Sequence, residues 1–259
     1  MASALYLYFD GLSLRKVQRY LKRRYGAKVS FRTILGWIEK YVPTVEKFTD
    51  SITPNLSGVW HSDETVLKFQ HGTPCPVKAN GKKERRKGSQ HWFWDCIDEG
   101  TRYLVSCHLS KTRSLEAGTQ HFKNCKAVGG RPKVIITDKL LGHGRFIRKA
   151  LWNPNKDKMV THIPTEAIPR HGEEAHNQMI ERFHGTLDDR VKPMRGLKSP
   201  DTAIPRGFRI HYNFFKPHEG IDYITPAEAA GIHLPFNDGW GNLMTWATYY
   251  QAMNNTKDN

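Results

Sequence analysis

The chain has 259 residues, of which 38% are hydrophobic, and this content is enough for a packed α/β domain with a small additional module. Lys and Arg total 40 against 25 Asp and Glu, so the formal net charge is +15. A field of this sign attracts polyanions, and nucleic acid is the leading partner, although a basic ribosomal or membrane-surface protein has the same sum. The composition excludes a disordered tail. No apolar run approaches the roughly 20 residues that a membrane-spanning helix needs.

Cysteine usage favours a reducing compartment. Cys75, Cys96, Cys107 and Cys125 contain no C-x-x-C pair, and disulfide frameworks belong to smaller secreted chains. No secretory signal is visible, so we expect a cytoplasmic protein. His121 and Cys125 have helical i, i+4 spacing, but no second pair accompanies them, which favours ordinary side chains over a zinc site.

Residues 1–45 are predicted to form a helix-turn-helix DNA-binding module. Apolar residues recur on one face of 13–24, with Ser13 as the N-cap and Gly26 just past the end. Ser30 can cap a second helix over 30–41, the expected recognition helix. An ordinary helical hairpin fits this pattern about as well. The residues of the second helix that remain available for a DNA groove are Arg32, Thr33 and Lys40.

Residues 46–57 are predicted to be a linker, because Pro43, Pro54 and the polar residues between them separate helical from strand-like periodicity. A second domain is expected over 58–235 and a C-terminal tail over 236–259. The predicted strands of the domain over 58–235 are 59–69, 90–98, 101–109, 133–137 and 159–163. Its predicted helices are 114–128, 146–152 and 174–192. The first three strands form an antiparallel meander. This element order is that of a ribonuclease-H-like fold, an α/β fold with a mixed five-stranded sheet flanked by helices.

Three acidic residues have settings that favour metal chemistry. Asp63 lies within the first strand, Asp138 ends the run Val134 to Thr137, and Glu181 lies on the last helix. Ligands collect at the carboxyl edge of strands in open α/β sheets. Carboxylates bind hard divalent cations, and two such cations can drive phosphodiester chemistry. The polar stripe on the last helix is otherwise typical of a solvated face.

Several motifs together resemble an insertion-sequence DDE transposase, of the insertion-sequence-six-like group in the retroviral integrase superfamily. These motifs are Trp60 to Thr65, Leu109 to Arg113, Thr137 to Lys139, Asn177 to His184, Lys192 to Ser199, and Tyr212 to Ile221 followed by Thr225 to Glu228. The resemblance implies metal-dependent DNA strand cleavage and strand transfer, with Asp63, Asp138 and Glu181 as catalytic residues and metal ligands. It also implies two Mg²⁺ ions, which Mn²⁺ can replace, and a homodimer or larger assembly on the terminal inverted repeats and target DNA.

The sequence departs from the family pattern at two points. The interval from Asp138 to Glu181 is longer than usual, and Glu173 sits at the shorter interval. Glu181 is preferred because its surroundings match the family motif, whereas Glu173 lies in a predicted loop. Lys216 stands where Arg is common and loses bidentate geometry toward phosphate or carboxylate.

Several other polar residues can be interpreted from their positions in the sequence. Glu64 should point away from Asp63 across the strand and is expected to be structural, while Asp95 has no clear role. His184 could contact a DNA phosphate or neighbour the acids. A basic cluster is expected to contact the DNA backbone rather than act as a solubilising loop, and it comprises Lys82, Lys83, Arg85, Arg86 and Lys87. Two alternatives remain, a DNA-binding regulator with an idle core and a nuclease without strand transfer.

Overall fold

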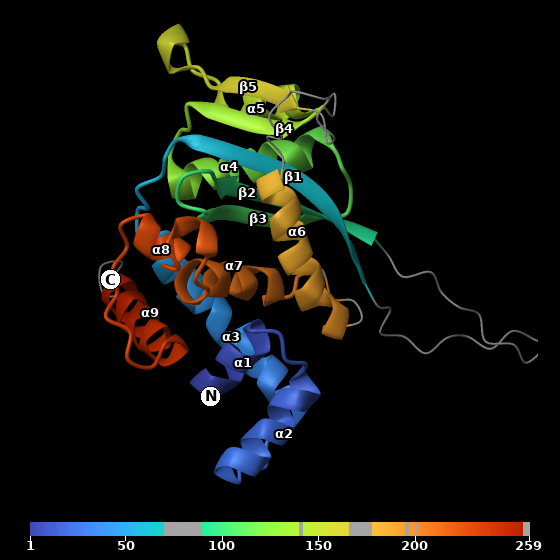
Figure 1. Ribbon diagram of the computed structural model, residues 1–259, viewed down its shortest axis with the longest axis vertical. Helices are drawn as coiled ribbons and strands as arrows, with labels where there is room; N and C mark the ends of the chain where they lie inside the picture. The colour runs from blue at the N-terminus through green and yellow to red at the C-terminus, as the bar shows by residue number, and fades with distance from the viewer. Residues whose placement is uncertain (70–89, 140–141, 166–177, 195–196, 200, 256–259) are drawn as a thin grey trace, which may run out of the picture.

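The computed structural model describes residues 1–69, 90–139, 142–165, 178–194, 197–199 and 201–255, and its centre is a five-stranded mixed sheet (Figure 1). The strands β1 (Val59–Lys68), β2 (Gln90–Asp98) and β3 (Leu104–Ser110) are antiparallel neighbours. Strand β4 (Val134–Asp138) runs parallel to β1, and β5 (Thr161–Thr165) runs parallel to β4. The resulting order, β3-β2-β1-β4-β5, confirms the predicted ribonuclease-H-like fold.

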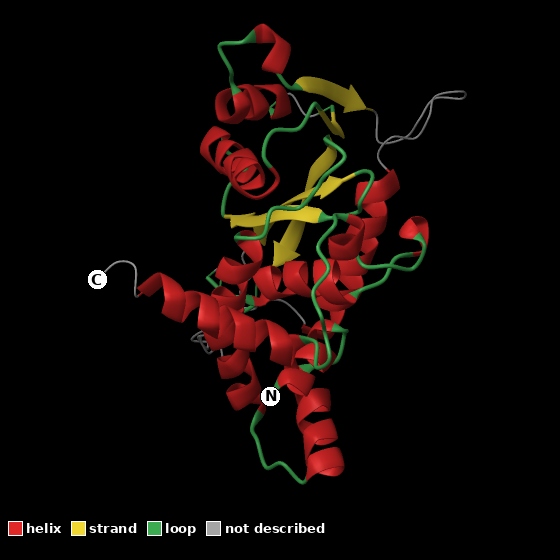
Figure 2. Cartoon of the chain, turned by 90° about the vertical axis from the view of Figure 1, so that its left-hand side faces the viewer, coloured by secondary structure: helices red, strands yellow, loops and turns green. Residues whose placement is uncertain are grey.

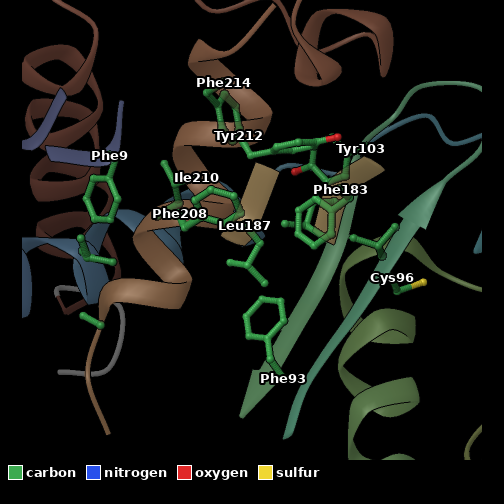
Figure 3. Packing of buried hydrophobic residues seen from close by; sticks show 14 of the residues in the cluster. Phe9, Phe93, Cys96, Tyr103, Phe183, Leu187, Phe208, Ile210, Tyr212 and Phe214 are labelled. Carbon is green, nitrogen blue, oxygen red and sulfur yellow. The ribbon is translucent and has the colours of Figure 1, made fainter. Parts of the chain in front are cut away.

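Helices cover both faces of this sheet. Helices α4 (Leu115–Gly129) and α5 (His143–Leu151) lie behind it in Figure 1, and α6 (Gln178–Val191) passes in front. Alternation along β2 explains the division, because Trp94 packs on Phe146 of α5 while its neighbour Phe93 faces the side of α6 and α7 (Ile204–Phe215). Figure 3 shows Phe93 near Leu187 and Phe208 on that side.

Three helices precede the sheet. They are α1 (Ala2–Phe9), α2 (Leu14–Tyr25) and α3 (Phe31–Asp50). The predicted caps are present, since the hydroxyls of Ser13 and Ser30 accept hydrogen bonds from Lys16 N and Thr33 N, and Gly26 has a φ of 65° at the end of α2. The use of α2 and α3 as a helix-turn-helix remains a prediction.

Helix α3 is longer than expected. The recognition helix was expected to end at Tyr41 and a linker to begin at 46, but α3 continues through Pro43 to Asp50. A proline inside a helix removes one hydrogen bond and costs roughly 3 kcal/mol. Burial of Val42 and Val45 and ion pairs made by the last turns of the helix offset this cost. The N-terminal helices are therefore joined to the sheet region by a helix that packs on α7, which in turn contacts β3. In Figure 2 the strands lie in the upper part of the molecule, and the N-terminus lies among the helices below them.

The C-terminal segment, expected to be a tail, contains a helix. Helix α9 (Trp240–Asn255) packs on α3 and α1, and Trp240 stacks on Phe9 with ring centroids 5.2 Å apart. A short helix, α8 (Pro226–Ala229), carries a capping box between Thr225 and Glu228. The remaining single turns are η1 (Lys156–Lys158), η2 (Lys192–Met194) and η3 (Glu219–Ile221).

Three elements differ from the prediction by two or three residues. Strand β3 begins at Leu104 rather than 101, because the Asp98 carboxylate accepts hydrogen bonds from the amide and hydroxyl of Thr101 and holds a turn in which Arg102 has a φ of 59°. Helix α5 begins three residues early, at His143, and β5 is shifted by two residues toward the C-terminus, after the turn η1. Within the described ranges, none of the helices is both long and apolar enough to span a bilayer.

Candidate functional site

Asp63 lies near the middle of β1 on the face that α6 covers. Its cross-strand partner is Asp95 of β2, whose side chain is fully buried. His184 of α6 lies over both carboxylates, with Nε2 2.9 Å from Asp95 Oδ2 and Nδ1 4.0 Å from Asp63 Oδ2. Two acids and one histidine from three elements thus form a cluster that is held largely away from solvent.

Burial governs the charge of this cluster. Burial raises the pKa of Asp63 to about 7, and the adjacent Asp95 carboxylate adds to the effect. Burial also raises the pKa of Asp95, against the attraction of His184. For His184 burial alone would lower the pKa, but Asp95 and Asp63 outweigh it and raise the pKa to about 9. The histidine is therefore a cation at neutral pH and partly neutralises the two acids.

Asp138 ends β4, next to β1. The parallel ladder pairs His61 with Ile136, and two residues further along both strands lie Asp63 and Asp138. The side chain of Asp138 is 31% exposed, and its Oδ1 lies 2.9 Å from His143 Nδ1. The topology therefore brings two of the predicted acids to neighbouring positions at the carboxyl end of a parallel strand pair.

Three further charged side chains, Glu64, His143 and Arg113, lie together next to Asp138. His143 Nε2 lies 2.9 Å from Oε2 of Glu64, whose side chain is fully buried. Arg113 also pairs with Glu64 and has Nη2 3.9 Å from Asp138 Oδ2. Burial acts to lower the pKa of His143, but its hydrogen bonds with Asp138 and Glu64 outweigh that effect and raise the pKa to about 9.

Glu181, the third predicted acid, is exposed on the first turn of α6. It lies three residues before His184, so both side chains project from the same side of the helix. The competing residue, Glu173, lies outside the described residues, as do Lys82, Lys83, Arg85, Arg86 and Lys87.

The donor types at this site suit a divalent cation, because Mg²⁺ and Mn²⁺ prefer carboxylate oxygens. Oδ1 of Asp95 is buried and, within the described ranges, makes no hydrogen bond, so the cluster retains acceptor capacity. Among the residues that the structure describes, however, no three His, Cys, Asp or Glu side chains gather closely enough to hold a metal ion. The chemistry of the acids fits a cation, and the described conformation does not assemble a three-residue ligand set.

The predicted DNA-contacting residues of α3 are on its surface. Arg32, Thr33 and Lys40 are exposed, Thr33 shares a hydrogen bond with the cap residue Ser30, and Lys40 lies over the ring of Tyr41. The structure adds a basic hollow on α2 that the sequence interpretation did not single out. The residues that line it are Lys16, Arg19, Tyr20, Arg23 and Arg24.

Sequence reasoning missed the partnerships of Asp95, Arg113 and His143. Arg113 belongs to one of the family-like motifs, which was a usable signal. Asp95 could have been placed opposite Asp63 only with the register of β1 and β2, and a connection of more than twenty residues hides that register.

Comparison with known families gives one match over half of the chain. A family described as the DDE domain matches residues 84–218. The search of curated proteins found no match.

The chain also matches several solved structures at low sequence identity. The HTLV-2 integrase catalytic core domain in complex with magnesium is 15% identical, covers 69% of this chain and 98% of its own, and gives a TM-score of 0.44. The simian T-cell lymphotropic virus intasome in complex with PP2A regulatory subunit B56 gamma is 15% identical, covers 87% of this chain and 76% of its own, and gives a TM-score of 0.48. The Mos1 strand transfer complex is 14% identical, covers 80% of this chain and 72% of its own, and gives a TM-score of 0.32.

Proposed function

Because the chain belongs to the DDE domain family of transposases, we propose that it cleaves and joins DNA strands at the ends of an insertion sequence, using divalent cations held by Asp63, Asp138 and Glu181. The observation that carries this proposal is the register of β1 and β4, which leads to Asp63 and Asp138 at neighbouring positions. Helix α6 contacts β1, and Glu181 lies on the first turn of this helix, three residues before His184.

Each acid has a defined task in this proposal. Asp63 and Asp138 orient oxygen lone pairs from rigid strands, and Glu181 completes the set from the first turn of α6. Bound Mg²⁺ would activate the attacking hydroxyl and stabilise the leaving oxygen of an in-line displacement at phosphorus. His184 holds Asp95 and faces Asp63, so we assign it to the support of these acids rather than to a DNA phosphate.

DNA is held by basic surfaces outside the acidic site. Residues 1–45 would bind the terminal inverted repeats through Arg32, Thr33 and Lys40, and the cluster from Lys82 to Lys87 would neutralise the backbone. Two ends must react together, so we include a homodimer or larger assembly on DNA in the proposal.

A joining assay tests the proposal. A labelled duplex carrying the inverted repeats that flank the coding region is incubated with plasmid DNA and Mg²⁺ or Mn²⁺. We expect joined product from the wild-type protein and a loss of roughly 10³-fold or more in each of Asp63→Asn, Asp138→Asn and Glu181→Gln. Glu173→Gln is the matched control and should keep wild-type joining.

The same assay separates the alternatives. Cutting without joining would identify a nuclease, and binding without either reaction would identify a regulator with an idle core. Wild-type joining by any of the three acid variants would show that the residue is assigned wrongly, and loss in Glu173→Gln with activity in Glu181→Gln would exchange the two glutamates.

A further inference from the structure

Four charged side chains that are distant in sequence meet behind the end of β4. Glu64 comes from β1, Arg113 from the connection between β3 and α4, Asp138 from the end of β4, and His143 from the first turn of α5. They alternate in charge, because each of the two cations pairs with Glu64 and also faces Asp138.

The inner part of this network is inaccessible to solvent. The side chain of Glu64 is 0% exposed and that of His143 is 1% exposed. A buried carboxylate is costly unless it is paired and hydrogen-bonded, and His143 and Arg113 provide these partners. The guanidinium of Arg113 is further fixed over the ring of Trp92, 4.8 Å from its centroid. Glu64 is therefore a rigid anchor and not a candidate ligand for a solvent-borne ion.

The outer part of the network ends at Asp138. The two ring nitrogens of His143 point in different directions, and each lies 2.9 Å from one carboxylate oxygen, Glu64 Oε2 or Asp138 Oδ1. Fixing one side of the ring therefore fixes the orientation of the other. The side chain of Asp138 is 31% exposed, so solvent can reach its carboxylate. The groups that align this carboxylate, His143 and Glu64, are themselves buried.

We propose that Glu64, His143 and Arg113 are positioning residues that orient the carboxylate of Asp138 toward a divalent cation. This inference rests on the proposed function, because it takes Asp138 as a metal ligand. It goes beyond that function by giving a task to Glu64, which directly follows Asp63 on the opposite face of β1. Partners behind a ligand typically change metal affinity by 10–100-fold when they are removed, since they set the orientation of the ligand.

The test measures Mn²⁺ binding to the full-length protein by calorimetry, without DNA and without turnover. We expect the Kd for Mn²⁺ to rise roughly 10–100-fold in Glu64→Gln and His143→Gln, with Asp138 intact. His143→Asn is the discriminating variant. Its amide can place an N–H near the position of Nδ1, toward Asp138, whereas the longer Gln reaches the position of Nε2, toward Glu64. We therefore expect His143→Asn to retain more affinity than His143→Gln.

Two control variants separate positioning from a general loss of structure. His211 is buried on α7 and has no contact with the network, so His211→Gln should leave the Kd unchanged even if it lowers the melting temperature. Arg206 pairs with Glu46 elsewhere in the fold, so Arg206→Lys should also leave the Kd for Mn²⁺ unchanged. Arg113→Lys should raise that Kd, because a lysine cannot reach the carboxylates of both Glu64 and Asp138.

The outcomes are distinct. Wild-type Kd values in folded Glu64→Gln, His143→Gln and Arg113→Lys, together with weak binding in Asp138→Asn, would overturn the positioning role and leave the metal site standing. Unchanged binding in Asp138→Asn would overturn the metal site, and the positioning role with it. Equal Kd values for His143→Asn and His143→Gln would show that the bond with Asp138 has no special weight, which also contradicts the inference.

Discussion

At the scale of single residues, Asp95 is held in place by one buried partnership. Its side chain is fully buried, and His184 is the cation in hydrogen-bond contact with it. Burial of an ionised carboxylate is tolerated when a partner supplies opposite charge and a donor, so the two side chains should be strongly coupled.

This coupling can be measured. Removing His184 alone, as His184→Gln, should lower the free energy of unfolding by roughly 3–5 kcal/mol, because it leaves the Asp95 charge buried and uncompensated. Adding Asp95→Asn should recover part of that loss. The measurement is urea unfolding at pH 7 of both single variants and the double variant. Additivity within about 0.5 kcal/mol would contradict the coupling.

The lowered pKa of His211 predicts how the free energy of unfolding changes as the pH falls. Burial lowers the pKa of His211 to about 3, and the charges of Arg190 and Lys216 contribute, while Asp10 lies 3.9 Å away. The unfolded chain takes up this proton near pH 6.5, so the stabilising contribution is complete above that pH and is lost as the pH falls toward 3.

The corresponding experiment compares wild-type protein with His211→Gln by urea unfolding between pH 7 and pH 4. The wild-type free energy of unfolding should fall more steeply with decreasing pH than that of the variant, by about 1.4 kcal/mol per pH unit below pH 6. Parallel pH profiles would show that His211 is not held in its neutral form.

At the scale of elements, the docking of α3 on α7 depends on one buried arginine. Arg209 is 6% exposed and pairs with Glu46 at 3.3 Å and with Asp50 at 2.6 Å. The neighbouring Arg206 is 38% exposed and pairs with the same Glu46. A buried pair loses more than an exposed one when a single partner is removed, because the remaining charges stay out of water.

We therefore expect Arg209→Gln to lower the free energy of unfolding by roughly 3 kcal/mol. Arg206→Gln, the matched control, should cost less than about 1 kcal/mol. Thermal and urea unfolding of both variants check this prediction. Equal losses would mean that the last turns of α3 are held by apolar packing and not by these ion pairs.

The same helix shows where prediction from sequence ends. Local signals were sufficient for the start of α2 and α3, because a serine cap and its hydrogen bond lie within three residues of each other. They were insufficient for the end of α3, because the partners that carry it past Pro43 lie about 160 residues away on α7. Prediction therefore favoured a break where the tertiary structure maintains a helix.

In the candidate site, too, local sequence signals placed some residues and could not place their partners. Asp63 and Asp138 could be placed from strand patterns and from the family resemblance, since each lies in a short readable run. Their partners could not, because His143 and His184 lie 79 and 89 residues from Glu64 and Asp95, which they contact. Such contacts are fixed by topology and register and have no local sequence signal.

At the scale of the whole molecule, the charge of +15 predicts strongly salt-dependent DNA binding. The basic hollow on α2 should contribute to it. In Arg19→Gln with Arg23→Gln, the slope of log K against log salt should become shallower by about 2, or about 1 per removed phosphate contact. Fluorescence anisotropy on a short duplex measures this slope. Lys123→Gln with Lys126→Gln, on the exposed side of α4, is the control, and an equal change there would contradict a specific role for α2.

The central claim is that Asp63, Asp138 and Glu181 together hold divalent cations. Its most direct test is a crystal structure of the full chain bound to terminal-repeat DNA and Mn²⁺, with anomalous diffraction to locate the metal. We predict an anomalous peak about 2.1 Å from carboxylate oxygens of Asp63 and Asp138, with Glu181 completing the ligand set. Manganese bound elsewhere, with these three side chains outside coordination distance, would contradict the account.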